Sequence, residues 1–190
     1  MYISTVGARP DRNNELIDSH FATDQALINS GLAWTILRMS VYGHATRRRE
    51  TRRSLWLLRG CSRSACGYAV RDDIAAAAAG ILATPGHEGM NHATGPVSIG
   101  QPEIAETIAK AAGKQISFKE MTAAEHRASL EATAIPAPLV QIFAGFQAAL
   151  RAGIFDLVTG DVGRLSGKQA ESPLEFLARN LASTVSGARG

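Results

Sequence analysis

The chain has 190 residues, of which 45% are hydrophobic and 19% charged, and its formal net charge is +3. These values are typical of a globular domain and exclude a disordered or fibrous chain. No stretch reaches the roughly 18 apolar residues of a membrane helix, and residues 1–10 lack a signal-peptide pattern, so we expect a cytoplasmic protein without membrane contact. Two cysteines are too few for a disulfide framework.

The positive charge is concentrated in one segment. Residues 44–68 contain seven arginines against one glutamate, a net charge of +6, so the rest of the chain carries −3. Alone, this segment could neutralise the phosphates of a nucleic acid, with Trp56 available for stacking, or it could be a solvated basic loop. Because one segment holds all of the excess charge, we do not expect a nucleic-acid partner.

The first part of the chain has the pattern of a strand, a helix and a second strand. A β-prone run over Tyr2–Val6 precedes apolar residues at helical spacing over residues 16–28, which end at Ser30-Gly31. Ala33–Leu37 follows as an apolar strand. This order is typical of a βαβ unit, in which the two strands are parallel.

An alanine-rich helix follows a brief predicted strand at Tyr68–Val70. Asp72 and Asp73 precede the alanine run and are predicted to cap the helix, which Pro85-Gly86 ends.

The remainder of the chain has the pattern of short strands and capped helices. Capping-box patterns at Ser98–Gln101, Thr122–Glu125 and Ser172–Glu175 predict three helix starts. Between them we expect a strand within Lys114–Met121 and a helix over Leu139–Ala152. The sequence therefore predicts an α/β protein with a helix-rich C-terminal part.

Few motifs carry chemistry. The chain contains neither G-x-G-x-x-G nor G-x-x-x-x-G-K-[ST], so it has no glycine-rich loop for a pyrophosphate. His20 and Asp24 share a helix face and could be an acid–base pair, two metal ligands or an exposed pair without a function. His87, Glu88 and His92 cluster in sequence, but no matching ligand spacing elsewhere supports a metal site, and we expect none.

Four segments carry a family resemblance: YISTVGARPD, DSHFATDQALINSGLAWTILRMSVY, YAVRDDIAAAAAGIL and ATGPVSIGQPEIAETIAKAAGK. In order and spacing they resemble the NmrA-like branch of atypical short-chain dehydrogenases, most closely its type 2 NAD(P)H:quinone oxidoreductases. The resemblance continues over residues 121–177. It implies an α/β fold that contains the C-terminal part of a Rossmann-type parallel sheet and a small helix-rich α/β substrate lobe.

The resemblance also implies a domain organisation. Residues 1–85 would form a partial NAD(P)-binding domain and residues 86–190 the substrate lobe. YISTVG would be the fifth strand of the family's sheet, so we expect four strands and the glycine-rich loop to be missing upstream. The pattern is interrupted over residues 43–67, which we hypothesise to result from a compensated frameshift.

The site residues follow from the same resemblance. His20-x-x-x-Asp24 occupies the place of the Tyr-x-x-x-Lys pair of typical members, and His20 is the candidate catalytic residue. No metal is implied. The candidate residues for binding NADP or NAD lie at the ends of two strands and are Ser4, Thr5, Val6, Met39, Ser40, Val41 and Tyr42.

The implied family activity is NAD(P)H-dependent reduction of a quinone-like small molecule by hydride transfer. We expect it to be impaired here because the glycine-rich loop is absent. A non-catalytic NAD(P) sensor that regulates a protein partner is the alternative, since the Tyr-x-x-x-Lys pair is also absent.

Overall fold

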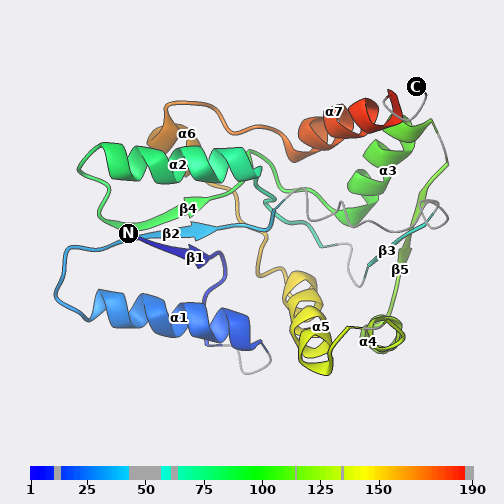
Figure 1. The fold of residues 1–190 in the computed structure, drawn as a ribbon, viewed down its shortest axis with the longest axis horizontal. Coiled ribbons are helices and arrows are strands. Elements are labelled where there is room, and N and C mark those ends of the chain that lie inside the picture. Colours follow the sequence, from blue (N-terminus) through cyan, green and yellow to red (C-terminus); the bar gives the residue numbers. More distant parts are fainter. Residues whose placement is uncertain (11–13, 43–56, 61–63, 114, 134, 187–190) are drawn as a thin grey trace.

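A computed structural model describes residues 1–10, 14–42, 57–60, 64–113, 115–133 and 135–186. In its first half, a parallel sheet has the order β1-β2-β4, with β1 at Tyr2–Thr5, β2 at Thr35–Met39 and β4 at Gly89–Ala93. Helix α1 (Glu15–Ile28) lies beside β1, and α2 (Arg71–Ala83) lies near β4 (Figure 1). The parallel pairing of β1 with β2 on either side of α1 confirms the predicted βαβ unit.

The second half combines a small sheet with helices. Strands β3 (Leu57–Gly60) and β5 (Ser117–Glu120) pair in parallel, and α3 packs against both β5 and α7 (Figure 1). These elements confirm the α/β class and the strand predicted within residues 114–121. The five helices of this half are α3 (Gln101–Ala112), α4 (Ala123–Glu131), α5 (Ala137–Arg151), α6 (Asp161–Ser166) and α7 (Pro173–Ser186).

The predicted boundary at residue 85 falls between α2 and β4. Although β4 follows this boundary, it pairs with β2, and α6 packs against α2. Part of the C-terminal segment therefore completes the first sheet and its helical cover, and the two-domain division stays a prediction. Strand β3 lies within the interrupted segment, but residues 43–56 and 61–63 lie outside the described residues, so the frameshift and phosphate-binding hypotheses stay untested.

The helix starts predicted at Thr122 and Ser172 are confirmed, because α4 and α7 each begin at the next residue. At the start of α4, Thr122 Oγ1 accepts the Glu125 N–H at 3.1 Å, and Glu125 Oε2 accepts the Thr122 N–H at 2.7 Å, as a capping box requires. The cap predicted at Asp72 and Asp73 is wrong. Helix α2 begins after Val70 without a side-chain cap, and Asp73 Oδ2 instead accepts the Glu171 N–H at 2.7 Å.

Two further local predictions shift by a few residues. Helix α3 begins after Gly100, whose N–H donates to the Glu103 carboxylate, whereas Ser98 Oγ donates to Asp156. The strand predicted at Tyr68–Val70 is reduced to an isolated bridge between Ala69 and Tyr42.

A buried ion pair fixes α1 to the sheet. Asp24 is 0% exposed, and its Oδ2 atom accepts from Arg38 Nη2 at 2.7 Å, Arg38 Nε at 2.9 Å and Ser4 Oγ at 3.1 Å. Ser4 on β1 and Arg38 on β2 are register partners. One carboxylate oxygen therefore joins the helix and both strands.

Helices α2 and α6 approach each other closely at Gly80. A Cβ atom added at this position would lie 1.9 Å from the carbonyl oxygen of Leu165. The absence of a side chain thus allows α6 to cover the core between α2 and the sheet. The buried residues of this core are Leu37, Ala69, Ile74, Ala77, Ile81, Ala93, Val162 and Leu165.

We expect Asp24→Ala to lower the free energy of unfolding by about 3–5 kcal/mol, because a largely buried guanidinium loses its acceptor. Denaturant unfolding followed by circular dichroism measures this loss. As a control, Glu106→Ala removes the exposed pair with Lys110 and should leave the denaturation midpoint unchanged. Equal midpoints for the two variants would contradict a structural role for the buried pair.

We expect Gly80→Ala to lower the free energy of unfolding by about 1–3 kcal/mol, because α2 and α6 must separate to admit the methyl group. The matched control is Gly163→Ala in α6, where the nearest atom to the added Cβ is 3.8 Å away. Alanine favours a helix over glycine by up to about 1 kcal/mol, so the control should keep or raise stability. Thermal melts of both variants distinguish crowding from helix propensity.

Candidate functional site

The three strands of the first sheet end side by side. Beyond the strands, the Val6 N–H donates to the Met39 carbonyl at 2.8 Å, and the Ser40 N–H donates to the Ala93 carbonyl at 2.9 Å. Open α/β sheets bind ligands outside the carboxyl ends of their strands. The seven residues that the resemblance assigned to cofactor binding therefore all lie at the carboxyl ends of β1 and β2.

Burial divides these seven residues into two groups. Ser4, Val6 and Ser40 are between 0% and 3% exposed, so a ligand cannot reach their side chains without rearrangement. Ser4 donates to Asp24, and Ser40 Oγ lies 3.9 Å from Cys66 Sγ. The other four residues, Thr5, Met39, Val41 and Tyr42, are half-buried.

Three of the half-buried residues form a surface with Arg71. The Tyr42 hydroxyl donates to Met39 Sδ at 3.2 Å, and Thr5 is the register partner of Met39. The Arg71 guanidinium carbon lies 5.3 Å from the centroid of the Tyr42 ring, within cation–π range. We call Thr5, Met39, Tyr42 and Arg71 the strand-end surface. It combines a hydroxyl, a thioether, an aromatic ring and a cation.

Sequence reasoning missed Arg71. Its place directly before Asp72-Asp73 was visible, but only the fold brings the first turn of α2 beside Tyr42. It also missed Arg38, although a single charge inside the apolar strand TILRM is a signal that a buried partner is needed.

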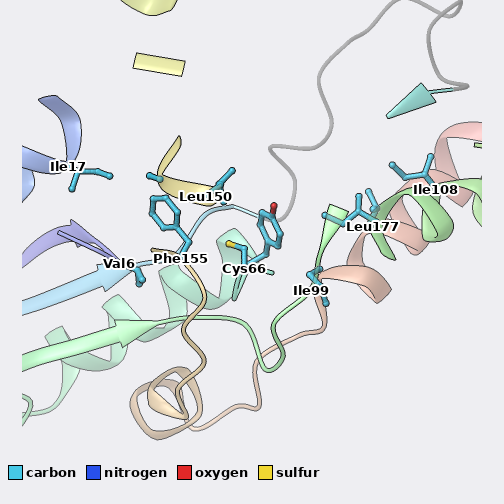
Figure 2. Close-up of a cluster of buried hydrophobic side chains, with 11 residues drawn as sticks. Val6, Ile17, Cys66, Ile99, Ile108, Leu150, Phe155 and Leu177 are labelled. Carbon is cyan, nitrogen blue, oxygen red and sulfur yellow. The ribbon is translucent and has the colours of Figure 1, made fainter. Parts of the chain in front are cut away.

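A packed core lies behind the strand ends (Figure 2). Val6, Cys66, Leu150 and Phe155 belong to one buried cluster, in which Phe155 is only 2% exposed. Burial raises the pKa of the Cys66 thiol to about 12, so it stays protonated at neutral pH and is a poor nucleophile. This cluster therefore supports the strand ends and offers no reactive group.

The segment that follows α5 closes this core over β1. At Gly7, where φ is +80°, an added Cβ atom would lie 2.1 Å from Ile154 Cγ2. Glycine is required at this turn because it adopts the positive φ without strain and because it leaves room for the Ile154 side chain.

A cavity of about 230 Å³ opens next to the strand-end surface. It lies between the first turn of α2 and one face of α7, and it includes Arg71 but none of the seven predicted residues. Its other lining residues are Val70, Asp72, Phe176, Leu177, Asn180 and Leu181. A second, more open hollow of about 530 Å³ lies over α3 and β5.

His20 lies apart from the strand-end surface. Its Nδ1 atom is 2.7 Å from the hydroxyl oxygen of Tyr2, the first residue of β1. His20 and Asp24 share α1 but contact different residues, since Asp24 binds Ser4 and Arg38. The catalytic assignment of His20 stays a prediction.

No metal centre is present within the described ranges, where no three His, Cys, Asp or Glu side chains gather. His87 Nε2 instead lies 2.9 Å from Thr84 Oγ1. Likewise, none of the helices built from described residues is long and apolar enough to cross a membrane.

The start of α1 is a poor site for a pyrophosphate. At the start of α1, Asn14 Oδ1 already accepts the N–H groups of Leu16 at 3.2 Å and Ile17 at 3.3 Å. The first turn also carries Glu15 and Asp18. A phosphate favours free N–H groups and positive charge, whereas this helix start is acidic and the N–H groups of Leu16 and Ile17 are already bonded.

The curated proteins to which this chain is similar in sequence include oxidoreductases. No family model matches the chain. Quinone oxidoreductase 2 of Escherichia coli (strain K12) is 27% identical over 146 residues, which are 74% of this chain and 51% of the relative. An uncharacterized oxidoreductase of Bacillus subtilis (strain 168), YesF, is 28% identical over 154 residues, which are 78% of this chain and 54% of the relative. The chain thus spans about half the length of the curated relatives it matches.

Solved structures with a similar fold also include a quinone oxidoreductase. The NADPH-dependent quinone oxidoreductase of Escherichia coli, solved in complex with NADPH, superimposes with a TM-score of 0.83 at 23% identity. The match covers 94% of this chain and 64% of that protein. Sequence and fold together confirm the resemblance to NmrA-like, atypical short-chain dehydrogenases, with quinone oxidoreductase 2 among the relatives, and they confirm a Rossmann-type sheet.

Proposed function

We propose that this chain is part of an NAD(P)H-dependent oxidoreductase that reduces quinone-like small molecules, and that the strand-end surface contacts the nicotinamide end of the cofactor. The observation that carries the proposal is the convergence of Thr5, Met39 and Tyr42 at the strand ends. A bound, reduced nicotinamide would supply the hydride.

The residues of the strand-end surface have separate roles in this proposal. The Met39 thioether and the Tyr42 ring offer a polarizable, largely apolar wall against which a planar ring can lie. The Thr5 hydroxyl, now 3.3 Å from the Val6 carbonyl, can turn to a polar substituent of that ring. Arg71 contacts the Tyr42 ring, and its positive charge would stabilise a quinone oxygen that becomes negative beside this ring.

The same proposal leads us to expect weak cofactor binding by this chain. The chain has no glycine-rich loop, and the first turn of α1 is capped by Asn14 and acidic. Ring contacts do not replace the main-chain N–H groups with which such a loop binds a pyrophosphate. We therefore expect NADPH to bind and turn over poorly.

We expect the 190-residue chain to oxidise NADPH slowly but measurably in the presence of a benzoquinone, with Tyr42→Ala lowering kcat/KM by about tenfold, which corresponds to about 1.4 kcal/mol. Absorbance at the nicotinamide band follows the reaction, and calorimetry measures NADPH binding. Leu32→Ala is the control, because Leu32 is 68% exposed and outside the strand-end surface.

The outcomes separate the two candidate functions. Binding of NADPH without turnover would favour the non-catalytic sensor over the reductase. An NADPH oxidation rate equal to that of the protein-free mixture, together with no measurable binding, would contradict both for this chain.

The prediction for His20 is tested in the same assay. If His20 delivers the proton that completes quinone reduction, His20→Gln should lower kcat by at least about tenfold without changing NADPH affinity. Tyr2→Phe is the matched control, since it removes the 2.7 Å hydrogen bond but keeps the imidazole. An unchanged kcat in His20→Gln would remove His20 from the reaction.

A further inference from the structure

One short buried segment joins the two halves of the molecule. Residues 66–70 are all buried, and their side chains contribute to both cores. Cys66 and Tyr68 belong to the cluster shown in Figure 2, whereas Ala69 belongs to the core between α2 and the sheet. We call residues 66–70 the seam segment.

The main chain of the seam segment is bonded to four other parts of the chain. Its partners are Ile99, which exchanges two bonds of 3.0 Å with Cys66, the Phe155 carbonyl at 3.0 Å from the Gly67 nitrogen, the Gly95 nitrogen at 3.1 Å from the Gly67 carbonyl, and the Val41 carbonyl at 3.0 Å from the Ala69 nitrogen. Gln101 Nε2 also donates to the buried Tyr68 hydroxyl at 2.7 Å. The C-terminal half and the first sheet therefore hold this segment jointly.

The seam segment ends at the strand-end surface. Ala69 forms a bridge with Tyr42, and Val70 directly precedes Arg71, the first residue of α2. The path of this segment thus determines where the Arg71 guanidinium lies, which is 5.3 Å from the centroid of the Tyr42 ring.

Gly95, which follows β4, allows a close approach to the seam segment. A Cβ atom added at Gly95 would lie 2.0 Å from the Tyr68 carbonyl oxygen, so any side chain would push the two main chains apart by at least about 1 Å. Asp73 Oδ2 accepts the Glu171 N–H at 2.7 Å, which anchors the first turn of α2. The displacement would therefore be taken up between Tyr68 and Asp73, where Arg71 lies.

We propose that Gly95 and Gln101 are positioning residues for quinone reduction, because they seat the seam segment and thereby keep Arg71 over the Tyr42 ring. Their role rests on the proposed function, in which Arg71 stabilises the negative charge that develops on a quinone oxygen. Misplacing a reacting group by about 1 Å can lower a rate by about a hundredfold, even when the substitution is remote. Both residues act through Arg71 and not on the substrate itself.

We expect Gly95→Ala to lower kcat with a benzoquinone by at least about tenfold and to leave the dissociation constant of NADPH unchanged, because Arg71 acts on charge that develops during the reaction. Gly80→Ala is the matched control. Its added Cβ atom meets the Leu165 carbonyl oxygen at 1.9 Å, far along α2 from Arg71, so it is equally crowded but should keep the parent kcat. Both variants are assayed at a temperature at which circular dichroism shows them folded. The same loss of kcat in both variants would overturn the proposal.

A double-mutant cycle with Arg71→Leu tests whether Gly95 acts through Arg71. In the Arg71→Leu background, Gly95→Ala should lower kcat by less than about twofold, because the group that it displaces is already gone. An equal loss of kcat in both backgrounds would overturn the proposal.

The position of Arg71 also has a readout that needs no turnover. In NMR spectra of the chain labelled at its arginine side chains, the Arg71 Nε–H resonance should carry a ring-current shift from Tyr42, identified by its loss in Tyr42→Leu. We expect this shift to be reduced in Gly95→Ala and kept in Gly80→Ala. A parent chain that oxidises no NADPH would contradict the proposed function, whereas an unchanged Arg71 resonance in Gly95→Ala would overturn the positioning role.

Gln101→Leu tests the same segment without crowding it, and it serves where Gly95→Ala does not fold. The substitution removes the donor to the Tyr68 hydroxyl, so both kcat and the Arg71 ring-current shift should fall, each by less than in Gly95→Ala. Gln141→Leu is the matched control, since it removes an exposed hydrogen bond with Arg127 and should leave both quantities unchanged. Parent values of both quantities in Gln101→Leu would overturn the proposal.

Discussion

One buried carboxylate sets the geometry on which the strand ends depend. Asp24 accepts three hydrogen bonds from two residues, Ser4 and Arg38, that lie opposite each other on β1 and β2. A buried charge is costly unless it is paired, and a shift of β1 by one residue would turn Ser4 away from α1. The ion pair thereby favours the register in which Thr5 lies beside Met39. The strand-end surface is a consequence of this register.

The chemistry available at that surface suits a planar ring. Behind it, Cys66 is held neutral by burial, and the interior is filled by residues such as Phe155. At the surface, a thioether, a phenol ring and one guanidinium meet. The acidic, capped start of α1 does not attract a phosphate. These properties are the basis on which we propose contact with the ring end of a dinucleotide rather than with its pyrophosphate.

The sequence predicts those parts of the fold whose determinants are close together in the chain. The βαβ unit follows from apolar periodicity, and the start of α4 follows from Thr122 and Glu125, three residues apart. The role of Asp73 could not be predicted, because its partner is Glu171, 98 residues away. β4 was not assigned to the first sheet, since GMNHA contains no β-branched residue to mark it as a strand. At the site, the seven strand-end residues were predicted by resemblance, but Arg71 and the burial of Ser4, Val6 and Ser40 depend on packing that the sequence does not reveal.

The central claim is that the strand ends contact the nicotinamide end of a cofactor. The most direct measurement is an NMR titration of the chain, labelled at its methionine methyl groups, with NADPH. The chain has four methionines. Met39 lies at the strand-end surface, and Met121 is an internal reference that is 8% exposed in the C-terminal half. We expect the Met39 methyl resonance to shift saturably under the ring current of the nicotinamide while that of Met121 stays in place. A Met39 resonance that does not move, in a titration where another methionine does, would contradict the claim.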